Sequence, residues 1–221
     1  MKRLLFFTLM VLVTAVAIYT LYYPTYSYRY RLTINIEADG KLHTASSVVE
    51  ASWSAFGLPS YHFNPELSGQ AALVDLGPHG VVVATLISGK EWGPVNGALG
   101  TLWVVPRAFD LKKGYELSAL ERLRGRRDLV LNDLPRFLWL SNPLDPTTAR
   151  TLSVQDFPNT IGPSVRFVGA SVEITNDPLV IDIRDKLPWL RSLEQRPAWD
   201  NIIYLPDGFP ISRALFIGGG S

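Results

Sequence analysis

The chain contains three histidines, the side chains that most often carry a proton or bind a metal near neutral pH. His79 lies in a Gly-Pro-His-Gly turn, where we expect an exposed side chain. His62 lies in a loop between aromatic residues and His43 near a strand end, and we expect both rings to pack. No two histidines have a ligand spacing such as His-x-x-x-His, so a zinc site would have to assemble from distant segments. The histidines therefore predict no metal site and no cofactor.

Other groups that could catalyse a reaction are sparse. Cysteine is absent, which excludes thiol enzymes and cysteine-ligated metals. The chain has neither the Gly-x-Ser-x-Gly nor the Ser-x-x-Lys pattern of serine hydrolases. Two carboxylate pairs, Asp182 with Asp185 and Asp128 with Asp133, have the residue type that glycoside hydrolysis needs. Basic residues lie beside both pairs, so we interpret them as solvated charges and predict no catalytic residue.

Two groups of side chains are candidates for a binding surface. The run Arg122-Leu-Arg-Gly-Arg-Arg127 could hold anionic headgroups or a partner's acidic face, although cations also suit the C-terminus of a helix. Two tryptophans beside prolines, in or near loops, could anchor an interface, although tryptophans also fill cores. The interface candidates are Trp92, Trp189, Arg122, Arg124, Arg126 and Arg127.

Composition bounds the size of the fold and the class of partner. The 21 basic and 20 acidic side chains give a formal net charge of +1. A nucleic-acid-binding protein needs a surplus of Lys and Arg to displace counterions, so nucleic acid is not expected as a partner. At 221 residues, with 47% hydrophobic and 19% charged residues, the chain is typical of one folded domain with a large core.

The N-terminal segment, Leu4 to Tyr23, contains no charged residue, Pro or Gly. Twenty residues in a helix rise about 30 Å, the thickness of the hydrocarbon layer, so the segment predicts a transmembrane helix. Ala15-Val16-Ala17 has the form of a signal-peptide cleavage site, but the apolar character continues to Tyr23 and favours an uncleaved anchor. Lys2 and Arg3 favour a cytoplasmic N-terminus, although Arg29 and Arg31 nearly balance them on the other flank.

Tyrosines follow where the chain would leave the lipid, a position typical of the aromatic belt at the headgroups. The predicted membrane-interface residues are Tyr19, Tyr22, Tyr23 and Tyr26. We therefore divide the chain into residues 1–23, the membrane anchor, and residues 24–221, one extracytoplasmic domain.

The first hairpin is the clearest element of that domain. From Tyr28 to Glu37 apolar and polar residues alternate strictly, which predicts a half-buried strand. Asp39-Gly40 is a favoured two-residue hairpin turn. A two-residue turn places Arg29 opposite Glu50, and this opposite-charge pair supports the register. A bulged turn would shift the register by one residue.

The remaining elements are shorter. Ser118-Ala-Leu-Glu has the form of a helix capping box, and Asp177-Pro178 that of an N-cap and first helical residue. Residues 54–68 are predicted as a loop. Strands are predicted within 71–88 around a turn at 77–80, and at 101–105, 137–140, 165–174, 201–205 and 209–217. The predicted fold class is α+β: one N-terminal transmembrane helix followed by a mostly antiparallel β domain with two or three short helices.

Three segments carry a resemblance to a known group of proteins. They are Tyr28-Arg-Tyr-Arg-Leu-Thr-Ile, Ser46-Ser-Val-Val-Glu-Ala-Ser-Trp53 and Pro135-Arg-Phe-Leu-Trp-Leu-Ser-Asn-Pro-Leu-Asp-Pro146. The chain resembles an uncharacterised proteobacterial family of small proteins with an N-terminal membrane segment. The resemblance implies a bacterial envelope setting and transfers no catalytic residue.

These observations predict a single-span envelope protein at the bacterial inner membrane with a periplasmic C-terminal domain. We expect a non-enzymatic accessory or partner-binding subunit of a membrane complex, with membrane lipid and another membrane or periplasmic protein as partners. The alternative is an envelope hydrolase acting on cell-wall or lipid material. A polar cleft that gathers His62 with two carboxylates would favour the hydrolase.

Overall fold

The computed structural model describes residues 6, 8–14, 16, 23–56, 62–88, 102, 104–112, 115–197 and 200–219. Within these ranges no helix is both long and apolar enough to cross a membrane. The predicted fold class is therefore wrong in its first element, the transmembrane helix. The described chain is mostly antiparallel β sheet with few and short helices.

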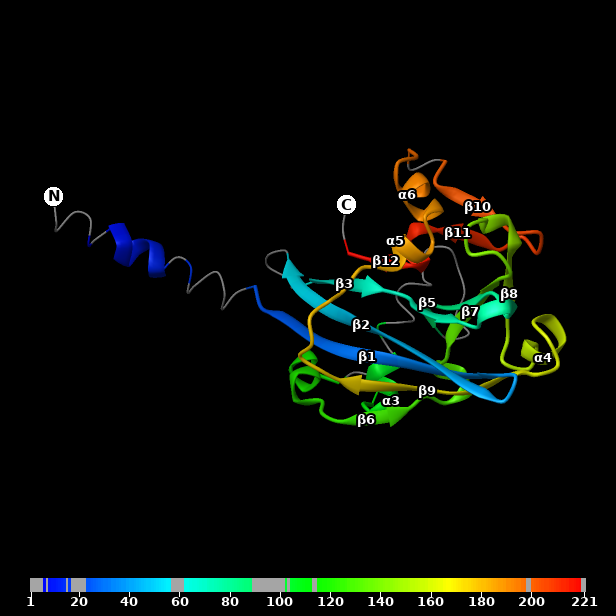
Figure 1. Ribbon diagram of the computed structural model, residues 1–221. Coiled ribbons are helices and arrows are strands. Elements are labelled where there is room, and N and C mark those ends of the chain that lie inside the picture. Colours follow the sequence, from blue (N-terminus) through cyan, green and yellow to red (C-terminus); the bar gives the residue numbers. More distant parts are fainter. Residues whose placement is uncertain are drawn as a thin grey trace.

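The largest sheet is built around the predicted first hairpin (Figure 1). Strand β1 (Thr25–Ala38) pairs with β2 (Lys41–Phe56), and Arg29 lies opposite Glu50 as predicted. Asp39 and Gly40 both have positive φ, as a two-residue turn of this kind requires. The unbulged register is therefore confirmed. Every second residue of β1 from Tyr28 to Ala38 is buried, which gives the sheet its apolar face.

Further strands complete two sheets and a separate hairpin. Sheet A has the order β12-β3-β2-β1-β9-β6, sheet B the order β4-β5-β7-β8, and β10 pairs with β11. Their bounds are β3 (His62–Gln70), β4 (Ala72–Asp75), β5 (Val81–Ser88), β6 (Arg126–Asp128), β7 (Pro135–Leu140), β8 (Ala149–Leu152), β9 (Val165–Ile174), β10 (Ile202–Tyr204), β11 (Pro210–Ser212) and β12 (Ile217–Gly218). The strand predicted at 165–174 is confirmed.

The helices whose two ends lie in the described part of the chain are all short. Their bounds are η1 (Gly77–His79), α3 (Val104–Ala108), η2 (Leu117–Arg122), η3 (Leu131–Asp133), η4 (Pro146–Thr148), α4 (Phe157–Thr160), α5 (Ile183–Lys186), α6 (Trp189–Glu194) and η5 (Arg213–Leu215). The predicted strand at 101–105 is wrong where it is described, because Val104 and Val105 begin α3. The predicted loop at 54–68 is also wrong, because β2 runs to Phe56 and β3 begins at His62.

Neither predicted helix cap forms, because each side chain binds another partner. Ser118 donates its hydroxyl to the Glu116 carboxylate instead of capping backbone N–H groups, and η2 is a 3-10 helix. Asp177 accepts from the Thr175 hydroxyl and from Arg31, so its carboxylate does not cap a helix either. The chain stays irregular until α5 begins at Ile183.

One apolar core lies between sheet A and sheet B. It includes the inner face of β1, the Val82–Ala84 stretch of β5, and the aromatic side chains Phe137 and Phe157, whose rings meet edge to face 5.6 Å apart. The two sheets are joined without a loop where β3 passes into β4. That junction determines the shape of the cleft described next.

Candidate functional site

A cleft of about 770 Å³ lies along one edge of β2. Every residue from His43 to Val48 lines it. If one face of β2 bordered the cleft, only every second residue would line it. Because consecutive residues line it, the backbone edge of β2 borders the cleft. The other walls come from the β3–β4 junction, from the end of β4 and from residues 177–186.

The edge is free because β3 leaves sheet A early. Strand β3 pairs with β2 only as far as Val49 opposite Gly69, and the chain then enters sheet B as β4. Gly69 has φ +121°, and a Cβ there would lie 2.6 Å from the Val48 carbonyl oxygen. Only glycine allows this bend so close to β2. Residues 42–48 of β2 therefore pair with β1 alone among the described strands.

The free edge presents backbone hydrogen-bonding groups to the cleft. Ala55 donates its N–H to the Pro24 carbonyl at 3.1 Å, which fixes the alternation along the β1–β2 ladder. The alternation repeats every second residue from Ala55, so Ser47 and Ala45 also direct their N–H and C=O toward β1. The N–H and C=O of Thr44 and Ser46 point the other way. Among the described residues, no backbone group pairs with them.

A buried hydroxyl belongs to the same stretch of β2. Ser47 lines the cleft and is only 7% exposed. Its Oγ has no hydrogen-bond partner among the described residues. A buried hydroxyl without a partner costs free energy and is uncommon in folded proteins. The cleft therefore contains a polar group that a bound molecule would satisfy.

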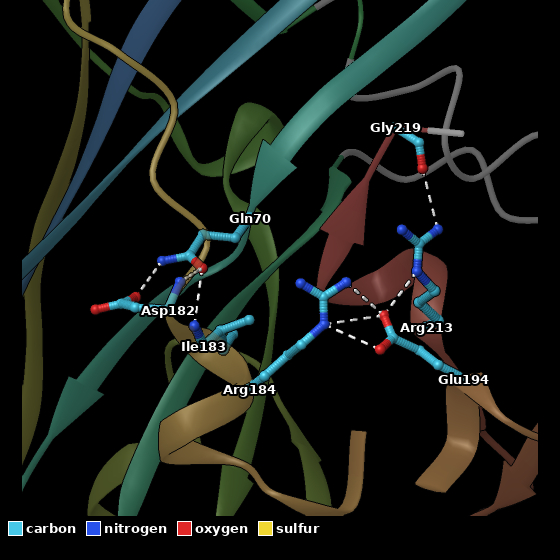
Figure 2. Close-up of polar contacts among 7 residues, drawn as sticks. All are labelled: Gln70, Asp182, Ile183, Arg184, Glu194, Arg213 and Gly219. Atoms are coloured by element: carbon cyan, nitrogen blue, oxygen red, sulfur yellow. Dashed lines mark hydrogen bonds and ion pairs between the residues drawn. The ribbon is translucent and has the colours of Figure 1, made fainter. Parts of the chain in front are cut away.

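Gln70 holds one wall of the cleft in place (Figure 2). Its Oε1 accepts from the N–H groups of Asp182 and Ile183 at 2.8 and 2.9 Å, and its Nε2 donates to the Asp182 carboxylate at 2.6 Å. The Gln70 side chain is buried. One glutamine thus satisfies two N–H groups at the start of α5 that have no partner within the helix.

Charged side chains line the same wall in pairs. Arg31 on β1 pairs with Asp177, and Lys186 pairs with Asp182 at 3.2 Å. The Thr175 hydroxyl and then Arg31 hold the pKa of Asp177 below its ordinary value. Hydrogen bonding from Gln70, with a smaller contribution from Lys186, lowers the pKa of Asp182. Both carboxylates are therefore ionised at neutral pH, and neither is poised to donate a proton.

A second set of ion pairs connects α5 to α6 and to η5 (Figure 2). The Glu194 carboxylate of α6 accepts from Arg184 at 2.8 to 3.2 Å and from Arg213 at 2.9 Å. Arg213 also donates to the Gly219 carbonyl at 3.0 Å. Arg184 first, and Arg213 as well, lower the pKa of Glu194. The network ties α5, α6 and the chain around η5 into one rigid support.

The cleft does not gather the groups of a hydrolytic centre. His43 closes one end, with Nδ1 2.8 Å from the Asp75 carbonyl oxygen. Ser47 lies four residues along the same strand, about 13 Å away, so the imidazole cannot take its proton. His62 is not among the lining residues; it is exposed in β3, with its ring 5.6 Å from Phe56. The described residues contain no group of three potential metal ligands.

His79 is not the freely exposed turn residue that we predicted. Its side chain is 23% exposed and its Nε2 lies 2.8 Å from the Asp39 carboxylate, which also accepts from Ser164. In a serine-hydrolase triad the imidazole lies between the hydroxyl and the carboxylate, whereas here the carboxylate lies in the middle. These three side chains tie the β1–β2 turn to η1.

The structure separates the predicted carboxylate pairs. Asp182 lines the cleft, but Asp185 is exposed and pairs with Arg191. Asp128 is exposed on β6, whereas Asp133 is buried and pairs with Arg107 at 2.6 Å. Asp182, Asp185 and Asp133 each form an ion pair with a basic side chain.

The predicted interface residues fall in several places. Trp92, Tyr19 and Tyr22 lie outside the described residues. Trp189 is half-buried: its Nε1 donates to the Pro143 carbonyl at 3.0 Å and its ring meets Phe216 edge to face. Tyr23 is half-buried, and Tyr26 lies 6.1 Å from the Phe63 ring.

The arginine run spans the end of η2 and the edge strand β6 instead of one helix C-terminus. Arg124 donates to the carbonyls of Glu121 and Leu123, and Arg127 lies over the Phe109 ring. Arg122 and Arg126 are exposed, as are the other two arginines. In the part of the chain that the structure describes, none of the four forms an ion pair.

Comparison with known proteins adds no assignment. No protein-family model, no curated protein and no solved structure matches the chain. The resemblance to a proteobacterial family stays a prediction. The candidate site therefore depends on geometry alone.

Proposed function

We propose that the protein is a non-enzymatic binding module that takes an extended segment of a partner protein in the cleft, as an added strand on β2. The unpaired backbone groups of Thr44 and Ser46 are the observation that carries this proposal. An exposed edge of this kind is the usual template for strand addition. The free edge from residue 42 to residue 48 spans about 20 Å, room for about six partner residues.

The lining supports a particular kind of segment. Alternate side chains of an added strand would lie beside Ala45 and Ser47, whose own side chains are small: a methyl group and a hydroxymethyl group. The charged side chains at the rim of the cleft are already paired with each other, so the net charge of a peptide should have little effect on its binding. We therefore expect an extended segment with small or apolar residues at every second position and a hydrogen-bonding side chain near Ser47.

A random peptide library displayed on phage tests this proposal. Ser46→Pro removes an N–H that points to the cleft and that β1 does not use, so the hairpin is retained while strand addition is blocked. Ser46→Ala keeps the N–H and is the matched control. We expect peptides selected on the wild-type protein to bind Ser46→Ala and to lose binding to Ser46→Pro.

Two results would contradict the proposal. One is the absence of any selected peptide. The other is equal binding to the proline and alanine variants, provided that circular dichroism shows both to be folded.

A further inference from the structure

A group of exposed aromatic rings lies at the end of sheet A where the N-terminal segment enters β1. Phe63 is 37% exposed and its ring lies 6.1 Å from Tyr26, the second residue of β1. Phe56, the last residue of β2, is 52% exposed. These three rings, here called the aromatic end, lie at the terminal rungs of the β1–β2 and β2–β3 ladders.

Two arginines without carboxylate partners belong to the same end of the domain. A shallow depression beside residues 27–29 of β1 is also lined by Arg124 and by Glu121 of η2. Arg122 and Arg124 are exposed and form no ion pair among the described residues. Although Arg124 donates to two backbone carbonyls, no carboxylate among the described residues neutralises either charge, so both can attract an anionic partner near the aromatic end.

The chain that precedes this end is apolar and exposed. The described side chains from Leu9 to Val13 are each more than half exposed. The apolar segment ends at Tyr23, two residues before β1 begins. Apolar side chains of this kind require a nonaqueous neighbour.

We propose that the aromatic end, with Arg122 and Arg124, lies on the headgroup layer of an anionic lipid surface. Aromatic rings and arginines are the side chains favoured at the boundary between headgroups and hydrocarbon. Each arginine near an anionic surface strengthens binding roughly fivefold. Exposed aromatic rings at this end of sheet A, next to the apolar segment that precedes β1, favour lipid over an acidic protein, which would match the arginines but not Phe56 and Phe63.

The absence of cysteine allows a direct test with single labelled positions. Asn64→Cys, next to Phe63 and exposed, reports on the aromatic end, and Leu42→Cys reports on the opposite end of the same strands. The full chain carrying an environment-sensitive fluorophore at one position is added to vesicles of phosphatidylcholine, with or without phosphatidylglycerol. We expect a blue shift and quenching by a lipid-borne quencher at position 64 with the anionic vesicles, and neither at position 42.

Charge reversal separates the arginine contribution from that of the apolar residues. Arg122→Glu/Arg124→Glu should abolish the quenching at position 64. The control, Arg150→Glu/Arg166→Glu, makes the same charge change where β8 and the start of β9 lie, at the far end of the domain (Figure 1), and should leave the quenching intact. Equal water exposure at positions 64 and 42, or quenching that survives reversal of Arg122 and Arg124, would overturn the proposal. So would an equal blue shift with soluble polyglutamate, which would assign the surface to an acidic protein.

Discussion

At the scale of single residues, Ser47 is a side chain that lowers the stability of the fold. Its hydroxyl is buried without a partner in the described structure, while the neighbouring Ala45 position takes a methyl group. A buried hydroxyl without a partner lowers stability by about 1–3 kcal/mol. In the proposed complex, the bound segment gives this hydroxyl a hydrogen-bond partner.

Ser47→Ala should therefore change stability and binding in opposite directions. We expect the free energy of unfolding to rise by about 1 kcal/mol, because the orphan hydroxyl is removed, and the affinity for selected peptides to fall. Urea unfolding and peptide titration measure the two effects. Ser27→Ala on the exposed part of β1 is the control and should change stability by less than about 0.5 kcal/mol. A Ser47→Ala variant that is less stable than the wild type would show that the hydroxyl already has a partner.

Asp177 makes the cleft wall sensitive to acid. Its pKa is lowered in the folded state, chiefly by Thr175 and then by Arg31. The folded protein therefore binds a proton less readily than the unfolded chain, so this stabilisation is present above the ordinary pKa of 3.8 and is lost as pH falls through the lowered value. We expect Asp177→Asn to be less stable than the wild type at neutral pH, with a difference that shrinks in acid. A difference that stays constant over the acidic range in urea unfolding would argue against the Asp177 pairing.

At the scale of elements, the bend between β3 and β4 creates the cleft, and Gly69 permits the bend. An alanine there would combine a disfavoured φ with a Cβ 2.6 Å from the Val48 oxygen. We expect Gly69→Ala to lower the free energy of unfolding by about 1–3 kcal/mol and to weaken peptide binding. Gly169→Ala on β9 is the control, because a Cβ there meets nothing within 4 Å. Equal stability of the two variants would show that β3 can bend elsewhere.

Gln70 attaches the irregular segment before α5 to the sheet. Gln70→Ala leaves the N–H groups of Asp182 and Ile183 without their acceptor, so we expect a loss of about 1–3 kcal/mol in stability. Hydrogen exchange should accelerate at residues 182–183 before it does in β1. The exposed Gln155→Ala is the matched control. Unchanged exchange at residues 182–183 in Gln70→Ala would refute the role of Gln70.

Elements were predictable from the sequence where local pattern and long-range packing agree. The β1–β2 hairpin combines strict alternation with a strong turn, so its register could be predicted to the residue. The helix caps predicted at Ser118 and Asp177 do not form because each side chain binds another partner, Glu116 in one case and Arg31 in the other. Arg31 lies 146 residues from Asp177 in the chain, so no local pattern contains that contact.

At the scale of the whole molecule, the cleft is a consequence of unequal strands. Strand β2 has 16 residues and β3 only 9, so among the described strands part of β2 pairs with β1 alone. The walls of the cleft come mainly from three segments that are distant in sequence. Most of the histidines and carboxylates that the sequence offered as catalytic candidates lie outside the cleft. The difference in length between β2 and β3 could have predicted the free edge, but only if residues 62–70 had been predicted as a strand.

Hydrogen exchange at the amides of Thr44 and Ser46 tests the central claim most directly. Both N–H groups point away from β1 and have no backbone acceptor in the described structure, so they should exchange rapidly in the free protein. The account predicts that a selected peptide slows exchange at these two amides while those of Ala45 and Ser47, already bonded to β1, change little. A peptide that binds tightly and leaves the Thr44 and Ser46 amides in rapid exchange would contradict strand addition at this edge.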